Sequence, residues 1–511
     1  MEKMMHGMSG HVMKGIPDSL AYASLAAIIV LTHIILVWKK GKGYRIETYP
    51  KWNLFRFPAF HKMVKSPSWP FFFQFIPMLL LLLILTAGFL GNPRKNIAPI
   101  LTWTWWWALL VFIILGFGKT FCAACPWEGV SRLISNLSIR RNLPKLNLGY
   151  KWPKPFRNLY PALILFIGLT WLELGFDITR NGYLTALMGL TMVVMAVSSA
   201  LIFEKRGFCR YACLVGRVSG IYALFSPLEL RSVDANVCAK CKTKDCVRGN
   251  EHDPGCPLYL NPSKFNENTY CTLCTSCVRT CPHNNIAISF RPFATDLLHK
   301  QTFRNDEALM AIVLLAMSSF HGLTMTPLWT HINHQIRVEF SLGKITVFSV
   351  LMFLMILAPI LLFGLTAWLS KWIAKVQEYG VADLLRAYAY PLIPVALFYH
   401  IAHNSMHFFM EGQNILPYLN DPFGFGWNLF PSLNRQFEPI LSLSTVWWLQ
   451  VFFIVVGHIF GVVVADRIAE RMFARKKQRF IALLPLILTM ILYSSFSIWL
   501  IAQPMAMKTA M

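Results

Sequence analysis

The sequence predicts an all-α polytopic membrane protein of about ten transmembrane helices, with a small cysteine-rich α+β domain inserted between its two halves. Two observations support this fold class. Hydrophobic residues make up 55% of the 511 residues and charged residues only 14%, a balance typical of multi-span membrane proteins. Eight of the twelve cysteines gather in the polar segment 238–281, which interrupts the apolar runs.

Ten apolar runs are long enough to cross a bilayer, because a transmembrane helix needs roughly 17–25 residues. The runs cover about residues 19–38, 70–90, 97–117, 159–176, 184–203, 307–329, 344–370, 382–404, 443–465 and 480–501. The first run is expected to remain as a span rather than be cleaved as a signal peptide. Its charges, Lys39 and Lys40, follow the apolar stretch instead of preceding it, and no small-residue cleavage site comes after it.

Basic residues are concentrated in alternate loops. The segments 39–69 and 118–158 carry eight Lys/Arg each and 466–479 carries six, whereas all the opposite segments together carry eight. Cytoplasmic loops are the ones enriched in Lys and Arg. We therefore expect a bacterial inner-membrane protein with both termini outside and the 204–306 insert in the cytoplasm. The net charge of +24 then reflects topology, and no nucleic-acid partner is expected.

These patterns divide the chain into four parts. They are an outer Met/His-rich tail (1–18), a five-span membrane half (19–229), a cytoplasmic cysteine-rich domain (230–305) and a second five-span half with a histidine-rich outer face (306–511). Thioether and imidazole ligands in the tail suit copper, although Met-rich termini also occur without a ligand.

The cysteines of the insert form two runs. The first reads Cys238-x2-Cys241-x4-Cys246-x9-Cys256-Pro257, and the second reads Cys271-x2-Cys274-x2-Cys277-x3-Cys281-Pro282. The second run has the bacterial spacing for a [4Fe–4S] cluster, and the first is a stretched version of it. Zinc sites use four ligands in two pairs, and a reducing cytoplasm disfavours disulfides, so both alternatives fit these runs less well.

In two-cluster folds of this type, the cysteine before the proline ligates the other cluster. The predicted cluster ligands are Cys238, Cys241, Cys246 and Cys281 for the first cluster, and Cys271, Cys274, Cys277 and Cys256 for the second. Such an insert is a bacterial-type 2[4Fe–4S] ferredoxin domain. Sulfur-bound iron carries single electrons, so the sequence predicts electron transfer rather than bond-making chemistry.

The first membrane half contains a duplicated motif. One hairpin of spans ends in Phe-Cys122-Ala-Ala-Cys125-Pro, and the next ends in Phe-Cys209-Arg-Tyr-Ala-Cys213-Leu. Duplicated hairpins place equivalent residues at the same membrane face, so we expect the two pairs to meet. Three interpretations are open: a third metal centre, a redox dithiol pair, or small apolar packing groups.

The order of these motifs resembles the NapH/NosR/CcoG-type membrane polyferredoxins, which are [4Fe–4S] membrane electron-transfer proteins. The resemblance covers about residues 70–290, and it departs from the family at Leu214, where the family usually has proline. Members pass electrons between quinones or cytoplasmic carriers and periplasmic metalloenzymes, or assist copper-enzyme assembly. The resemblance therefore implies a redox component, quinol dehydrogenase-like in role.

Histidines mark the second membrane half. His400, His403 and His407 are spaced i, i+3 and i+7, which places them on one helical face, and His321 lies at a similar depth on another span. His458, near the middle of the ninth run, is a candidate axial partner for His400. Haem b, copper and structural hydrogen bonding all remain open for these residues.

Clusters in the cytoplasm cannot alone reach an outer acceptor across a hydrocarbon layer ~30 Å thick. A haem, a mobile quinone or a partner subunit must bridge that distance. Glu173 and Asp177, at the outer end of the fourth run, form a candidate proton site for a quinone.

The sequence thus predicts a membrane-bound electron-transfer protein that exchanges electrons among a cytoplasmic carrier, the quinone pool and an outer-side acceptor. Its expected partners are membrane lipid and these redox proteins. The alternative is a copper-reducing or metalloenzyme-assembly factor of the CcoG/NosR type, which the outer Met and His residues favour. A transporter whose insert senses redox state is a third class. The sequence contains no Walker-type phosphate loop and no hydrolase motif.

Overall fold

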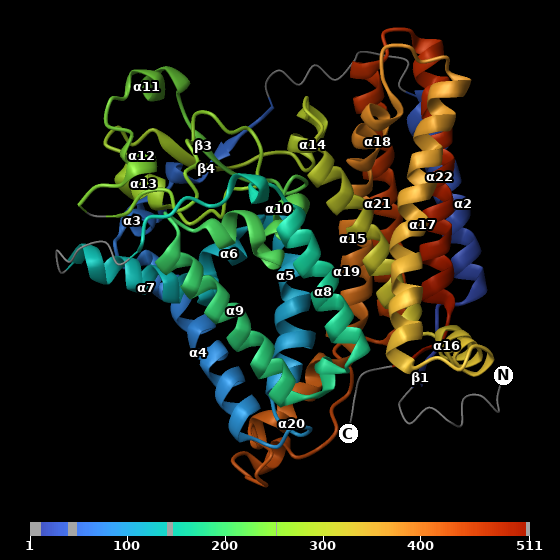
Figure 1. Cartoon of the computed structure of the whole chain (residues 1–511), viewed down its shortest axis with the longest axis horizontal. Helices are drawn as coiled ribbons and strands as arrows, with labels where there is room; N and C mark the ends of the chain where they lie inside the picture. The colour runs from blue at the N-terminus through green and yellow to red at the C-terminus, as the bar shows by residue number, and fades with distance from the viewer. Residues whose placement is uncertain (1–11, 39–48, 141–146, 252, 507–511) are drawn as a thin grey trace.

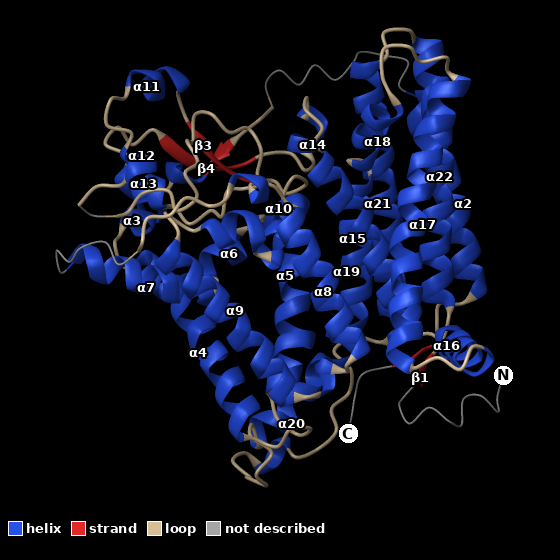
Figure 2. Ribbon diagram, viewed as in Figure 1, coloured by secondary structure: helices blue, strands red, loops and turns tan. Residues whose placement is uncertain are grey.

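The computed structural model describes residues 12–38, 49–140, 147–251 and 253–506, and this part of the chain is mostly helical (Figures 1 and 2). It contains nine helices or continuous helical segments that are long and apolar enough to cross a membrane. Seven of them are single helices: α2 (Asp18–Trp38), α4 (Trp69–Leu90), α9 (Gly182–Ile202), α15 (Asn305–Thr324), α17 (Lys344–Ile373), α21 (Leu443–Met472) and α22 (Lys476–Ala502). The eighth is the segment Ile100–Phe117, which ends in α5 (Trp107–Phe117). The ninth is the segment Val381–Asn420, which contains α18 (Val381–Ala389), α19 (Leu392–Glu411) and α20 (Ile415–Asn420). The chain is therefore a multi-pass membrane protein.

The fourth predicted run, 159–176, forms the shorter apolar helix α8 (Tyr160–Gly175). Its 16 residues extend about 24 Å, which is less than the ~30 Å hydrocarbon thickness. The sixth predicted run, 307–329, is also shortened. Helix α15 ends at Thr324, and α16 (Pro327–Glu339) begins separately because its proline occupies the first helical position and Thr326 caps it.

The membrane helices form two groups that differ from the predicted halves (Figure 1). One group contains α4, α5, α8 and α9, where the close approach of α4 to α9 requires Gly88, since a Cβ there would lie 2.5 Å from the Gly182 oxygen. In the other group α2 packs against α21 and α22, so the first span joins the C-terminal half. Helices α15 and α19 are buried along most of their length and connect the groups, whereas α2, α4 and α17 expose apolar side chains.

The cysteine-rich insert lies at one end of the helices (Figure 1). Its segment begins on β3 (Leu228–Ser232) and returns on β4 (Ile286–Phe290), which pair antiparallel from Leu228 opposite Phe290 to Ser232 opposite Ile286. The described strands lie there, apart from a short pairing of β1 (Val12–Met13) with β5 (Met505–Ala506) at the opposite end (Figure 2). The first and last described segments of the chain are therefore paired on the side away from the insert.

The segment before the second span completes the insert, which the sequence did not reveal. β2 (Trp52–Asn53) adds to β4, giving the sheet order β2-β4-β3. Helix α3 (Pro58–Lys65) follows, and its Val64 is buried with residues of β3, β4 and the cysteine runs. Three short helices complete the insert, namely α11 (Ala235–Lys240), α12 (Asp245–Arg248) and α13 (Ser276–Thr280).

Buried ion pairs hold the insert against the membrane helices. Lys300 donates to the Glu307 carboxylate of α15 at 2.8 Å. Tyr390, between α18 and α19, donates to the same carboxylate at 2.5 Å. Within the insert, Arg291 of the loop after β4 lies between Glu229 and Asp296, at 3.0 and 2.5 Å. Burying these charges is favourable only because each has its partner.

We predict that Arg291→Met lowers the free energy of unfolding by about 3 kcal/mol, because it removes the nearest cation of the buried Asp296 carboxylate and leaves only Arg231, at 3.9 Å, in its place. The measurement is thermal or denaturant unfolding of the purified protein in detergent. Arg180→Met is the matched control, since its pair with Asp177 is exposed and should contribute at most about 0.5 kcal/mol. Equal stability of the two variants would contradict the assigned role of Arg291.

Candidate redox and metal centres

The first cysteine quartet combines three cysteines of the first run with the last cysteine of the second run. Its members are Cys238, Cys241, Cys246 and Cys281. Burial, followed by the neighbouring thiols of the other three, raises the pKa of the Cys246 thiol to about 11. Asn285 bridges the two runs: its side chain donates to Cys238 Sγ at 3.3 Å and its backbone N–H to Cys281 Sγ at 3.4 Å.

The second quartet combines the last cysteine of the first run with three cysteines of the second run. Its members, Cys256, Cys271, Cys274 and Cys277, line one apolar cavity of about 320 Å³ together with leucines and Phe265. Burial raises the pKa of Cys256 to about 12, with Cys274 as the next cause. The grouping is therefore crossed: the cysteine that precedes proline in each run lies with three cysteines of the other run.

Unusual backbone conformations shape these loops. Leu273 and Thr275, between the cysteines of the second run, have positive φ values of 53° and 60°. Non-glycine residues rarely adopt this conformation, so the loop is held there by its surroundings. In the loop after the first run, the Leu260 backbone N–H donates to Cys256 Sγ at 3.3 Å. Such N–H···S bonds stabilise negative charge on sulfur and tune the potential of a bound cluster.

A third quartet lies where the two duplicated hairpins end. Its members are Cys122, Cys125, Cys209 and Cys213, and they line a single cavity of about 460 Å³. Helix α6 (Thr120–Ala124) carries Cys122, and α7 (Pro126–Arg140) begins directly after Cys125. A π-helical turn over Phe208–Ala212 carries Cys209, and Cys213 precedes α10 (Leu214–Tyr222). The expected meeting of the two pairs is thus what the structure shows.

The second and third quartets are neighbours. Leu258 and Thr272 line the cavities of both. On its other side, the third quartet's cavity shares Phe121, Trp127 and Val215 with an apolar cavity of about 970 Å³ between α4, α5 and α9. A series of adjoining cavities therefore leads from the insert into the membrane region.

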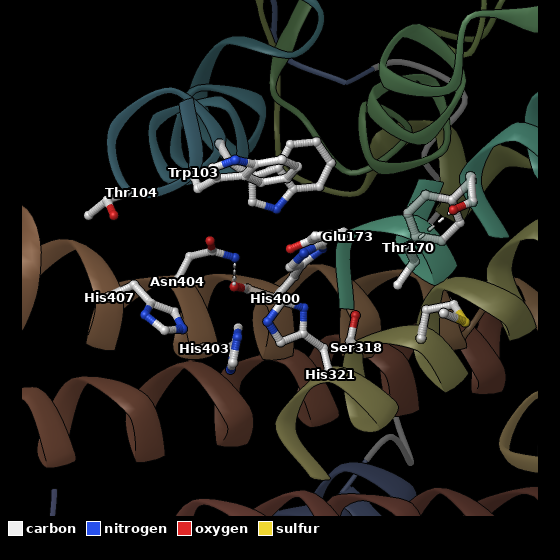
Figure 3. Close-up of a pocket in the computed structure, with 13 residues that line it drawn as sticks. Trp103, Thr104, Thr170, Glu173, Ser318, His321, His400, His403, Asn404 and His407 are labelled. Carbon is white, nitrogen blue, oxygen red and sulfur yellow. Dashed lines mark hydrogen bonds between the residues drawn. The ribbon is translucent and has the colours of Figure 1, made fainter. Parts of the chain in front are cut away.

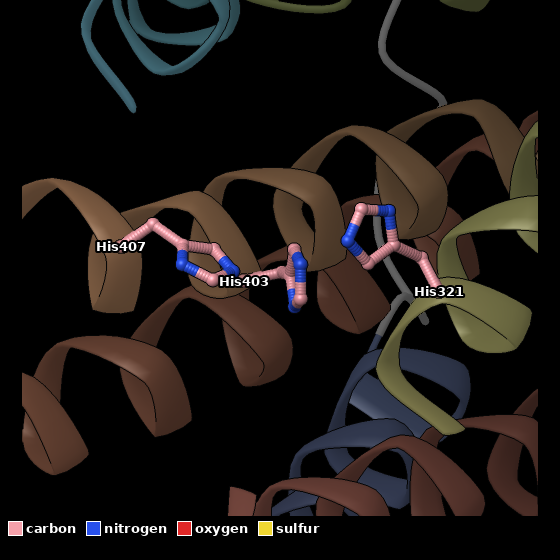
Figure 4. A group of neighbouring side chains, drawn as sticks. All are labelled: His321, His403 and His407. Carbon is pink, nitrogen blue, oxygen red and sulfur yellow. The ribbon is translucent and has the colours of Figure 1, made fainter. Parts of the chain in front are cut away.

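Three histidines converge between α15 and α19 (Figure 4). One ring nitrogen each of His321, His403 and His407 lies within 4.8 Å of the others. The Nδ1 atom of His407 lies 2.7 Å from a carboxylate oxygen of Glu411, one helical turn later. That leaves the buried Nε2 of His407 without a hydrogen bond and directed toward the group, which is the geometry of a metal-binding imidazole oriented by a carboxylate.

The histidine group lines a cavity of about 650 Å³ that also contains Trp103, Trp107 and Glu173 (Figure 3). The two tryptophans also line the large apolar cavity, so the series of cavities continues to the histidines. Of the proposed quinone proton site, Glu173 lines this cavity, whereas Asp177 is exposed and pairs with Arg180.

The two remaining candidate histidines have other contacts. His400 lines the same cavity, but its Nδ1 lies 3.2 Å from the Tyr222 hydroxyl. His458 is not part of that cavity, and both of its ring nitrogens make hydrogen bonds, at 3.0 Å to Thr32 and 2.8 Å to Ser494. The structure therefore does not bring His458 to His400 as an axial partner. The Met/His tail before residue 12 lies outside the described residues.

Several residues around these centres were missed by the sequence reasoning. Glu411 follows His407 by four residues, so helical periodicity alone indicates their contact. Glu128, two residues beyond the Cys-Pro pair, makes a buried ion pair with Arg206 across the two hairpins. Arg217, in an otherwise apolar helix next to Cys213, is also completely buried.

Comparisons with known proteins give partial matches. No protein-family profile matches the chain, and no solved structure matches it significantly. An uncharacterized protein of Methanocaldococcus jannaschii is 28% identical over 191 residues, which cover 36% of this chain and 70% of that protein. The Escherichia coli protein named "Putative electron transport protein YccM" is 24% identical over 233 residues, which cover 41% of this chain and 61% of its own length. The chain is therefore a multi-pass membrane protein with partial similarity to a protein named for electron transport.

Proposed function

We propose that this chain is a membrane electron carrier that holds two [4Fe–4S] clusters on the first two cysteine quartets. The supporting observation is the crossed grouping of the insert's cysteines. Cys256 lies with the second run and Cys281 with the first, although each is nearer in sequence to its own run. Crossing of this kind is characteristic of two-cluster ferredoxins. When bound, the clusters would supply one-electron redox chemistry.

The spacing of the sulfurs favours clusters over single ions. A zinc ion with Zn–S bonds of about 2.3 Å holds its four sulfurs within about 4 Å of one another. Within the described residues, the histidine group has the spacing of a single-ion site, and no cysteine quartet is among the groups that do. All twelve cysteines are free thiols, as expected where the compartment is reducing.

The proposed orientation places the insert in the cytoplasm of a bacterial inner membrane. The helix ends beside the insert adjoin the Lys/Arg-rich segments, and cytoplasmic loops carry such an excess. The paired strands β1 and β5 then lie on the outer side. The histidine cavity, near the ends of α15 and α19 that lie away from the insert, would face an outer-side acceptor.

The large apolar cavity is suited to the ring of a quinone. Its lining is almost entirely apolar, and Trp103, Trp106 and Trp107 contribute aromatic surface, as is typical of ligand sites. Oxidation of a quinol releases two electrons and two protons. In this proposal the two electrons would pass one at a time to the cysteine-bound centres, and Glu173, in the adjoining cavity, would accept the two protons one after the other and release each to bulk water. This role agrees with the resemblance to NapH/NosR/CcoG-type proteins and with the name of the E. coli relative.

The crossed ligation predicts which cysteine variants share a spectroscopic defect. Cys256→Ser should abolish the same paramagnetic signal as Cys274→Ser, and Cys281→Ser the same signal as Cys241→Ser. Each variant should lose about four irons, because each removes a ligand from one [4Fe–4S] cluster. The measurements are iron analysis and electron paramagnetic resonance of anaerobically purified protein.

The paired variants serve as matched controls for one another. If Cys256→Ser instead affected the signal that Cys241→Ser abolishes, the crossed assignment would be wrong. Zinc in place of iron in the parent protein would overturn the proposed function itself.

A second candidate function is metal handling for copper-enzyme assembly, supported by the histidine group. Three imidazole nitrogens within 4.8 Å, with His407 held by Glu411, suit one divalent copper or zinc-like ion. The short separations among these three imidazoles disfavour haem, because the haem ring would have to fit between two of them as axial ligands. His458, with both nitrogens engaged, offers no second axial position.

We predict that the double variant His403→Ala/His407→Ala abolishes binding of one Cu²⁺ or Co²⁺ ion per chain, measured by titration of metal-stripped protein. Glu411→Gln should weaken binding by about 10–100-fold, because Glu411 orients the imidazole of His407. His331→Ala is the control, since that residue lies exposed on α16. Metal binding that survives the double variant would show that the three imidazoles only hydrogen-bond within the protein.

A further inference from the structure

We propose that Cys122, Cys125, Cys209 and Cys213 hold a third iron–sulfur cluster, with the buried side chains of Arg217 and Lys119 as its counter-charges. This inference rests on the proposed electron-carrier function and extends it to the membrane face. The four thiols line one cavity, and their chemistry is that of the other two quartets.

The principal observation is the isolation of Arg217. It belongs to α10, every residue of which is buried, and the arginine itself has 0% exposure. Its Nε, Nη1 and Nη2 atoms make no hydrogen bond in the described part of the chain. The guanidinium lies over the Tyr270 ring, 4.7 Å from its centroid. A buried charge without a partner is strongly unfavourable, so Arg217 requires a negative group beside it.

The thiols of the third quartet are the groups placed to supply that charge. Arg217 follows Cys213 by one helical turn, with its backbone N–H bonded to the Cys213 carbonyl at 2.9 Å, and negative charge on Cys122, Cys213 or Cys209 would stabilise its cation. Glu128, the carboxylate that lines the cavity of the four thiols, is already engaged, because Arg206 and Arg132 both pair with it. As neutral thiols the cysteines would leave the arginine uncompensated, whereas a thiolate-ligated cluster carries net negative charge.

Lys119 adds a second cation at the same place. Its side chain is 1% exposed, and Nζ donates to the Thr269 carbonyl at 3.3 Å. Burial lowers the pKa of Lys119 to about 7, with the cationic Arg217 as the next cause. The thiols of Cys122 and Cys213 of the third quartet, and Cys271 of the second, act in the opposite direction. Negative charge on the cysteines of either quartet would therefore stabilise the cationic form of Lys119.

Helix ends reinforce this arrangement. Each hairpin's second cysteine stands directly before a helix: Cys125 before α7 and Cys213 before α10. Helix N-termini stabilise anions, and the Gly216 N–H donates to Cys213 Sγ at 3.3 Å. The two duplicated hairpins thus present equivalent cysteines, each at a positive helix end, to one cavity.

The position of the third quartet gives the cluster a role. Its cavity shares residues with that of the second quartet on one side and with the large apolar cavity on the other. The two electrons of a quinol in the apolar cavity would reach this centre one after the other on the way to the insert, with the two protons leaving by way of Glu173, and reduction of a quinone would be the reverse. The centre therefore links the insert to the membrane.

The first test is the iron content of the parent protein, prepared anaerobically. Three [4Fe–4S] clusters predict about twelve irons per chain, and two predict about eight. Cys122→Ser and Cys213→Ser should each lose about four irons and one paramagnetic signal, while the two signals assigned through Cys274 and Cys241 persist. Persistence of those signals also shows that the variants have folded.

The second test concerns Arg217. Arg217→Met should shift the midpoint potential of the third signal to more negative values, because a nearby cation favours the reduced, more negative cluster. Arg157→Met removes an exposed charge beside the same membrane face and should leave that potential unchanged. Arg217→Lys should retain the parent potential more closely than Arg217→Met.

Three results would overturn the inference while leaving the two-cluster proposal intact. They are about eight irons in the parent protein, zinc in the third quartet, or disulfides joining its cysteines in anaerobic preparations. Absence of iron from all three quartets of the parent protein would instead contradict the proposed function as a whole.

Discussion

Compensation of buried charge is the constraint on which the rest of the structure depends. Where the insert meets the membrane helices, Lys300, Arg291 and Arg206 are buried, and each lies within ion-pair distance of a carboxylate. Arg217 and Lys119 are buried without a carboxylate partner, Arg217 over the Tyr270 ring and Lys119 on the Thr269 carbonyl. In the proposed account their counter-charge would come from the cysteines of the third quartet, because metal ligation displaces the thiol protons.

The candidate centres and cavities form a continuous series. The crossed quartets of the insert, the quartet at the hairpin ends, the apolar cavity and the histidine cavity follow one another, each sharing lining residues with the next from the second quartet onward. The centres are held by rigid elements: strands β3 and β4 bracket the insert, and the buried helices α15 and α19 carry the histidines. In the proposed function, electrons would pass along this series, and proton transfer would take place at its membrane end, where Glu173 lies.

Much of this organisation could be predicted from local sequence. Span positions follow from apolar run length, and the grouping of Cys256 and Cys281 follows from the position of proline after each run. The meeting of Cys125 with Cys213 follows from duplication of the hairpins. These inferences succeed because each depends on a short motif whose geometry is fixed by the backbone.

Other features depend on contacts between distant segments, which no local pattern encodes. The packing of α2 against α21, and the pairing of β2 with β4, join residues hundreds of positions apart. From the sequence, His458 is as good a candidate ligand as the other membrane histidines. In the structure, however, its two ring nitrogens are hydrogen-bonded to Thr32 and Ser494. Arg217 looks like an ordinary basic residue near a membrane surface until its complete burial is seen.

X-ray absorption at the iron edge, recorded on anaerobically purified protein, tests the central claim most directly. The account predicts iron surrounded by sulfur, with a second shell of neighbouring iron that only a cluster provides. Iron bound solely by nitrogen and oxygen, or zinc as the sulfur-bound metal, would contradict it.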